Sequence, residues 1–391
     1  MPQAPPASRK VQPDSLALMA WCSFAFPLCM VFWLATGCAD SSREGGASSP
    51  DSTNTSGDQV GNPSVGESLP GEIAAAIQQS GRWAMAGDWA AAVEALDSVI
   101  KAGANEARLF ALRAHFRQNA GDFAGALADA EQATKLDPSY AWGYSTKAEV
   151  LMSMGRNEEA LTNVSRAILL SPEDGDSYLI RARLQAATGR TASALADYDR
   201  VLALAPKGAT NLTLMARMER APLLAATGNY EAAVEDLNHL SKAVPTDARF
   251  YAIRGLIQAQ LGRIAQGIQD CKKAVELDPS SVLALNNLAW LLAVVPDAHW
   301  RDGKQAVELA TKACEITRWE NPIFLGTLAA AYAEEGDFAS ALKWQEQAIA
   351  LGISDSDLSA ARRRLTAYQK HEPWRQILSD DGHVERPSGT K

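Results

Sequence analysis

A glycine recurs along this chain at a fixed interval, and that period restricts the fold more than any other feature. The interval is 34 residues between Gly87, Gly121, Gly155 and Gly189, and again between Gly228 and Gly262. Periods of roughly 20–50 residues are typical of chains that stack copies of one small structural unit, each touching only its neighbours. The sequence therefore predicts a repeat array and not a domain around a single core.

The residues around each glycine predict two helices per repeat. Glycine ends the first helix because it takes up the left-handed conformation without strain. The Asp or Asn that often follows can cap the second helix. A small residue five positions on lets the second helix approach the first, and a proline 17 positions on ends it. The small residues are Ala92, Ala126, Ala160, Ala194, Ala233, Gly267 and Ala341, and the prolines are Pro138, Pro172, Pro206, Pro245 and Pro279.

This pattern resembles the tetratricopeptide repeat (TPR) family, most clearly in AGDFAGALADAEQATKLDPS and TGNYEAAVEDLNHLSKAVPT. The resemblance implies an all-α fold, a right-handed α-solenoid of about eight TPR helix-turn-helix repeats with a C-terminal capping helix. The array is expected over 71–355, with repeats at about 73–106, 107–140, 141–174, 175–208, 209–247, 248–281, 282–321 and 322–355. The capping helix is expected within 356–375, and 376–391 is expected to be a disordered tail.

Two repeats are five residues too long. The first surplus, near Ala209 to Thr213, is expected to lengthen the following helix or its connection, and Pro222 is expected to kink that helix. The second surplus falls around Val295 to Gly303, in the turn between the two helices of the seventh repeat.

Residues 1–38 predict a signal peptide or membrane anchor. Arg9 and Lys10 precede an uncharged apolar stretch that is followed by Gly37 and Cys38. Small residues before a cysteine resemble the lipobox of bacterial lipoproteins, which implies lipidation of Cys38, although the leucine lies one position earlier than is usual in that family. The stretch is also long enough to cross a bilayer uncleaved, or it could be a buried helix of a soluble protein, and these alternatives stay open.

Residues 39–70 are rich in Ser, Gly, Asn, Asp and Pro and hold too few apolar residues to fold. They predict a flexible tether that spans roughly 30 Å between the membrane and the array. The resemblance to lipoproteins implies an extracytoplasmic, periplasmic location in a bacterium. Ala39, in place of the Asp typical of inner-membrane retention in that family, favours the outer membrane.

A basic residue and an Asp or Asn recur 16 positions apart in five central repeats. In the last two repeats both positions are apolar together, and this joint change predicts contact. We interpret the pairs as a ladder between the first helix of a repeat and the second helix of the same or the preceding repeat, structural in role rather than a binding stripe. The pairs are Arg113 with Asp129, Lys147 with Asn163, Arg181 with Asp197, Arg220 with Asp236 and Arg254 with Asp270.

The sequence shows no catalytic or cofactor-binding motif, and no metal is expected. The five histidines are scattered, and Cys271 and Cys314 belong to no metal-binding pair and are expected in the core. Acidic residues outnumber basic ones, 46 to 37, which argues against nucleic acid as a partner. We therefore expect a non-enzymatic chain without a cofactor.

The resemblance implies that the concave face, lined by the first helices, holds an extended or helical segment of another protein. The second, fifth, ninth and twelfth places of each repeat would face this groove, Asp176 among them. The candidate partner-binding residues are Arg108, His115, Trp142, Glu149, Arg183, Arg249 and Trp290. The carboxylate clamp of chaperone-binding TPRs is absent, because Lys and Asn do not occupy the fifth and ninth places, where Ala111 and His115, for example, stand.

The leading hypothesis is thus a non-catalytic scaffold or adaptor for other proteins, tethered to the extracytoplasmic side of a membrane. Its alternative is a glycan- or polymer-binding accessory of a cell-envelope assembly machine, in which Trp142 and Trp290 stack against sugars. The identity of the partner and the oligomeric state stay open.

Overall fold

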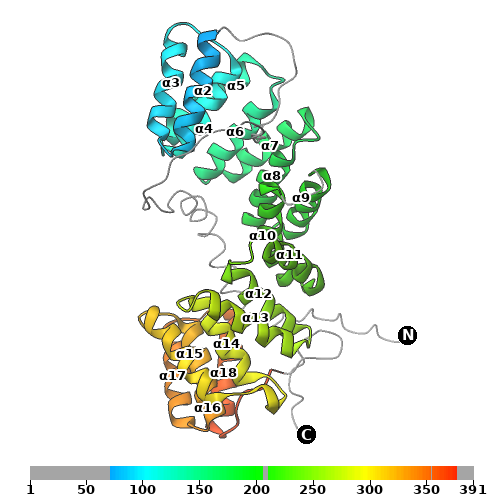
Figure 1. The fold of residues 1–391 in the computed structure, drawn as a ribbon, viewed down its shortest axis with the longest axis vertical. Helices are drawn as coiled ribbons and strands as arrows, with labels where there is room; N and C mark the ends of the chain where they lie inside the picture. Colours follow the sequence, from blue (N-terminus) through cyan, green and yellow to red (C-terminus); the bar gives the residue numbers. More distant parts are fainter. Residues whose placement is uncertain (1–70, 206–209, 354, 377–391) are drawn as a thin grey trace, which may run out of the picture. The chain divides into compact units, whose positions relative to one another are not determined.

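The computed structural model describes residues 71–205, 210–353 and 355–376 of the 391-residue chain (Figure 1). The expected signal or anchor with Cys38, the expected tether over 39–70, and the expected tail from residue 377 onward lie outside the described residues. The described residues form seventeen α-helices and one 3-10 helix, and contain no strand, so the expected all-α class is confirmed for this part of the chain. None of these helices is both long and apolar enough to span a bilayer.

The helices fall into two compact units, which are described separately. The N-terminal unit comprises the described residues 71–200. Its helices follow one another as antiparallel neighbours in the order expected for helix-turn-helix repeats. They are α2 (Gly71–Met85), α3 (Trp89–Lys101), α4 (Ala107–Asn119), α5 (Phe123–Leu136), α6 (Ala141–Ser153), α7 (Asn157–Leu170), α8 (Gly175–Ala187) and α9 (Thr191–Leu204), the last of which continues past residue 200.

The C-terminal unit comprises the described residues from 201 to 376. Its α-helices are α10 (Asn211–Ala226), α11 (Tyr230–Ala243), α12 (Ala248–Gln260), α13 (Ile264–Leu277), α14 (Val282–Val294), α15 (Gly303–Ile316), α16 (Pro322–Glu335), α17 (Phe338–Ala350) and α18 (Asp355–Gln369). The second surplus of residues forms the 3-10 helix η1 (Ala298–Trp300) between α14 and α15. The expected capping helix is α18, and the chain beyond it runs on to Gln376 without further helix.

Local sequence signals account for the helix ends. Gly121 has φ +84°, in the left-handed region that glycine occupies without strain. The following Asp122 caps α5 by accepting the Gly125 amide at 2.9 Å. Asn229 differs from this expectation, because its side chain makes no cap hydrogen bond to α11.

The core lies between the helices of each pair and depends on small residues. Gly255 of α12 and Gly267 of α13 form the closest approach. A Cβ added to either glycine would lie 2.6 Å from the backbone oxygen of the other. Cys271 fills the same contact as a buried, free thiol, and Cys314 is buried in the next pair, as expected for core residues.

The first group of additional residues, expected near Ala209 to Thr213, lies at the start of α10. This helix has 16 residues, three more than α8 or α12 with 13 each, and Pro222 lies buried inside it. The helix continues through Pro222 to Ala226, and the expected kink stays a prediction.

Candidate protein-binding groove

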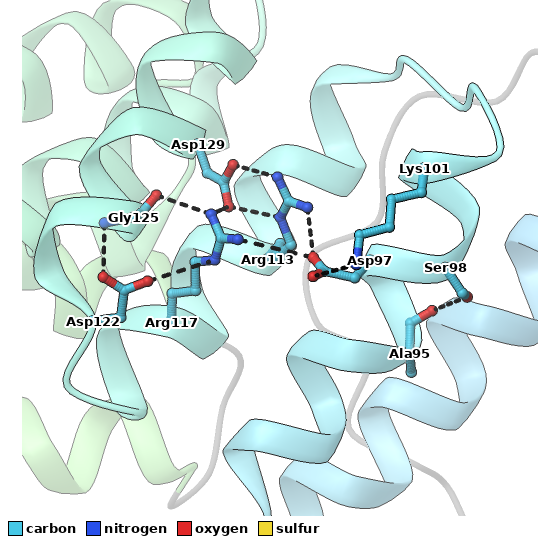
Figure 2. A network of polar contacts seen from close by, with 9 residues as sticks. All are labelled: Ala95, Asp97, Ser98, Lys101, Arg113, Arg117, Asp122, Gly125 and Asp129. Atoms are coloured by element: carbon cyan, nitrogen blue, oxygen red, sulfur yellow. Dashed lines mark hydrogen bonds and ion pairs between the residues drawn. The ribbon is translucent and has the colours of Figure 1, made fainter.

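Most ladder residues are charged side chains that are paired with one another inside the array. Arg113 of α4 donates to Asp129 of α5 from Nε at 2.8 Å and from Nη2 at 2.6 Å, and its Nη1 donates to Asp97 of α3 at 2.6 Å. Figure 2 shows this network together with Arg117, which lies one turn further along α4 and also donates to Asp129, at 2.8 Å. One guanidinium thus joins its own repeat to the preceding one.

The same two-point geometry recurs in three further repeats. In each, Nε and Nη2 of the arginine donate to the two carboxylate oxygens at 2.7–2.8 Å, a fork geometry that matches carboxylate shape. The structure thereby pairs Arg181 with Asp197, Arg220 with Asp236, and Arg254 with Asp270.

The fifth expected pair does not form within the described residues. Lys147 Nζ lies 3.4 Å from Glu131 of the preceding repeat, and Asn163 donates to the backbone oxygen of Glu159 at 2.8 Å. The physical reason is that an uncharged amide offers little to an ammonium group, which acts as a point charge and lacks the fork of a guanidinium.

A second set of acceptors was not recognised from the sequence. Asp97 and Glu131 lie 34 residues apart, and each receives the basic residue of the following repeat. Asn238 occupies the equivalent place and accepts Arg254 Nη1 at 2.9 Å. All three stand two positions after the ladder place, so a recurring polar residue at that offset is the signal that could have identified them.

The ladder is therefore satisfied internally. Three of its arginines also lie over the aromatic residue one turn earlier on the same helix, at 5.5 Å for Arg113 over Phe110, 5.4 Å for Arg181 over Tyr178 and 5.2 Å for Arg254 over Tyr251. Guanidinium groups held in this way by carboxylates and rings have little left for a partner, which supports the structural interpretation over the binding one.

The other candidate residues of the N-terminal unit lie on three neighbouring first helices. Arg108 and His115 belong to α4, Trp142 and Glu149 to α6, and Arg183 to α8. Helix α6 contacts both α4 and α8. The ninth places of the three repeats, His115, Glu149 and Arg183, thus follow one another across one face of the unit, and all three are half-buried.

The middle of this face concentrates carboxylates. Burial raises the pKa of Glu149 to about 7; the positive charge of Arg183 opposes this, and the negative charges of Asp176 and Asp174 add to it. Burial and the charge of Asp174 likewise raise the pKa of Asp176. Within the described part of the chain, the Glu149 side chain accepts no hydrogen bond. Glu149 is thus a carboxylate without a hydrogen-bond donor, and the charge of Arg183 only partly offsets its burial.

The rest of the face combines a histidine and aromatic rings with the arginines Arg108 and Arg183. Burial lowers the pKa of His115, whose Nε2 lies 3.2 Å from Asn119 Nδ2, so the ring is held neutral. At the start of α6, the Trp142 ring meets Tyr140 edge-on, with centroids 6.2 Å apart. Burial raises the pKa of Tyr140 to about 12, and the positive charge of Arg108 opposes this shift.

Two candidates in the C-terminal unit are already occupied. Arg249 pairs with Asp247, the cap residue of α12, with Nη2 and Oδ2 2.5 Å apart. The Trp290 indole N–H donates to Gln376 Oε1 at 2.9 Å, and the Arg364 guanidinium lies 5.8 Å from the Trp290 ring centroid. Trp290 therefore already has a hydrogen-bond partner within the chain, and its expected contact with another protein stays a prediction. Gln376, where the disordered tail was expected to begin, lies among the described residues.

Among the described residues, no group of three or more His, Cys, Asp or Glu side chains is arranged to hold a metal ion.

Comparison with protein families gives two matches. Residues 218–282 match the family described as "Tetratricopeptide repeat", and residues 78–223 match the family described as "ETO1 C-terminal domain". The two matched segments together run through most of the helical part of the chain.

Several solved structures are similar to this chain, and one of them, with a TM-score of 0.50, shows the same fold. The Cut9 and Hcn1 assembly of the APC/C is 12% identical over 74% of this chain and 56% of that chain, with a TM-score of 0.50. A tetratricopeptide repeat protein from Parabacteroides merdae ATCC 43184 is 17% identical over 76% of this chain and 99% of that one, with a TM-score of 0.41. YrrB, described as a TPR protein with an unusual peptide-binding site, is 22% identical over 49% of this chain and 97% of its own, with a TM-score of 0.42.

Proposed function

Because this chain is a tetratricopeptide-repeat protein, a fold that supports protein–protein interaction, we propose that it is a non-catalytic scaffold that holds a partner segment against α4, α6 and α8. We propose further that residues 1–38 tether it to the extracytoplasmic side of a bacterial membrane through Cys38. The first part is supported by the face described above, and the second by the resemblance of the N-terminus to lipoproteins.

The carboxylate of Glu149, which accepts no hydrogen bond among the described residues, carries the proposal for the groove. Burial raises its pKa to about 7, and the positive charge of Arg183 offsets this loss of hydration only in part. A lysine or arginine of a bound segment would supply that partner and would favour the ionised form. The ladder carboxylates, in contrast, already have their arginines.

Trp142 gives the same face an apolar contact beside the acidic cluster. Half-buried aromatic side chains are typical anchors of protein interfaces. The segment that fits this face is therefore basic, with an apolar side chain about two helical turns away along α6, where Trp142 packs beside Phe110 and Ala111. In the glycan alternative, Trp290 would have to stack on a sugar while its indole N–H donates to Gln376.

Quantitative co-purification from native membranes tests this proposal. We expect Trp142→Ala and Glu149→Gln to lower the yield of the partner at least about tenfold, since central aromatic and buried charged contacts dominate binding energy. Glu235→Gln, an equal loss of charge on the exposed side of α11, is the matched control and should leave the yield unchanged. If all three variants recover the partner equally, the partner does not bind at this face.

A further inference from the structure

The first helix of the seventh repeat, α14, ends differently from the others. At the end of α16, Gly336 turns left-handed, and the amides of Gly336 and Asp337 return to the last carbonyls of the helix. Helix α14 has no such glycine, and its C-cap residue, Val295, is extended. In the connection to α15, the Asp302 amide donates to the Leu292 oxygen at 3.0 Å, which lies before the last carbonyls of α14.

The last carbonyl oxygens of any helix have no partner within that helix. In this repeat the additional residues between α14 and α15 leave several of these oxygens open to other hydrogen-bond donors. Arg301, which follows η1, is one such donor: its Nη1 donates to the Val295 oxygen at 3.1 Å and to the Pro296 oxygen at 2.6 Å. The carbonyls of Ala293 and Val294 are left for another segment.

That segment is the end of the described chain, residues 372–376, which we call the strap. Arg375 Nη1 donates to the Ala293 oxygen at 3.2 Å, and the Gln376 amide donates to the Val294 oxygen at 3.0 Å. Trp374 packs among the apolar residues of α14 and α16. The strap thus presents an aromatic ring, a guanidinium and a backbone amide in sequence.

Glu334 of α16 completes the site. It accepts Arg301 Nε at 2.9 Å, and its other oxygen lies 2.5 Å from Arg375 Nη2. The Glu334 and Arg301 side chains are only 14% and 15% exposed and both belong to the array. Because Arg301 belongs to the array, its contact with the carboxylate involves no residue of the strap, and this is the preorganisation that a binding site needs.

We propose that these groups form a second peptide-binding site, the cradle, made of Trp290, the Ala293 and Val294 carbonyls, and Glu334. Its ligand is an extended partner segment in which an aromatic residue precedes an arginine, and the strap occupies the site in the free chain. Charge complementarity selects this ligand, because every free group of the cradle except the Trp290 N–H accepts hydrogen bonds. An acidic segment would meet Glu334 and a row of carbonyl oxygens.

The strap is held by few residues and joins α18 through a short turn at His371, where φ is +60°. An intramolecular occupant of this kind competes at an effective concentration in the millimolar range. A partner that offers the same contacts and further ones can therefore replace it. The inference shares with the proposed function only the premise that the chain binds protein segments, and it concerns different helices.

The test uses the full chain and a fluorescein-labelled peptide of residues 372–376, Glu-Pro-Trp-Arg-Gln, in fluorescence anisotropy. Trp374→Ala with Arg375→Ala should vacate the cradle and tighten peptide binding at least about tenfold relative to the wild-type chain. Arg375→Glu, which keeps the aromatic ring and places like charge beside Glu334, should do the same and covers the case in which the double variant misfolds. Lys370→Ala, outside the strap, should bind as weakly as the wild-type chain.

Adding Glu334→Gln to the Trp374→Ala and Arg375→Ala chain should abolish the gain in peptide affinity, and so should replacing the arginine of the peptide by alanine. Trp142→Ala and Glu149→Gln should leave peptide binding unchanged. A failure of the cradle proposal can therefore be distinguished from a failure of the proposal for α4, α6 and α8. Equal binding by the wild-type and both vacated chains would overturn the inference. A wild-type dimer that dissociates on Trp374→Ala with Arg375→Ala would also overturn it, because the occupant would then be the strap of a second copy.

Discussion

Arg113 holds Asp129 with two hydrogen bonds, of 2.8 Å from Nε and 2.6 Å from Nη2, while the two side chains are only 10% and 6% exposed. This contact joins the two helices of one repeat. Because the guanidinium also reaches Asp97, it ties that repeat to the preceding one. In a linear array such contacts between neighbours carry much of the stability.

Loss of one member of this pair should be costly. We expect Asp129→Asn to lower the free energy of unfolding by about 3 kcal/mol, because two arginines then lose a buried carboxylate. Lys147→Ala, which removes only a 3.4 Å contact to an exposed glutamate, should cost about 0–1 kcal/mol. Urea denaturation measures both, and equal values for the two variants would contradict the buried role of Asp129.

The Gly255 and Gly267 contact predicts a steric effect. Gly267→Ala should destabilise the C-terminal unit by about 1–3 kcal/mol, because the new Cβ would lie 2.6 Å from the Gly255 oxygen. Gly81→Ala is the matched control: no atom lies within 4 Å of the added Cβ, so the variant should stabilise α2 by about 1 kcal/mol. Thermal unfolding distinguishes the two, and stabilisation by both would show that α12 and α13 are further apart.

Glu149 predicts a pH dependence of stability. Below pH 4.5 the carboxyl is protonated in both the folded and the unfolded chain, so Glu149→Gln changes little. As the pH rises from 4.5 to about 7, the unfolded chain loses this proton first, and folding is progressively penalised. Since the side chain is half-buried, solvent screening limits the penalty to about 1–2 kcal/mol above pH 7.

The measurement is urea denaturation of the wild-type chain and of Glu149→Gln at pH 4.5 and pH 8. The variant should be the more stable protein at pH 8 only. A difference that is the same at both pH values would mean that Glu149 titrates like an exposed carboxylate.

The N-terminus predicts a lipid anchor. Radiolabelled palmitate should enter the wild-type protein and Cys29→Ser, and it should be absent from Cys38→Ser, because only Cys38 follows the small residues of a lipobox. Equal labelling of all three proteins would leave the uncleaved apolar stretch as the anchor.

The repeat period was sufficient to predict much of this architecture, since each helix pair depends on local signals within 34 residues. Gly121 predicts a helix end from its conformational preference, and Asp122 predicts a helix start from its capping preference. The bond between Arg181 and Asp197 could be inferred because both places change together from repeat to repeat.

Contacts outside the period could not be inferred in this way. Trp290 and Gln376 are 86 residues apart, and the strap has no counterpart in any other repeat with which to compare it. The carbonyls that attract the strap are open because α14 lacks a closing glycine, and the sequence shows this only as a surplus of residues near Val295. At Lys147 the comparison of repeats predicts a contact that does not form. The recurring position suggests Asn163 as its partner, but the lysine lies beside Glu131.

The central claim is that the face of α4, α6 and α8 holds a partner protein, and photo-crosslinking in native membranes tests it most directly. A photo-reactive phenylalanine replaces Trp142 in one chain and Glu235 in another, and cross-linked proteins are identified by mass spectrometry. We predict one dominant protein cross-link from position 142, lost when Glu149→Gln is added, and none from position 235. Cross-links of equal yield at both positions, or a yield at position 142 that Glu149→Gln does not change, would contradict the claim.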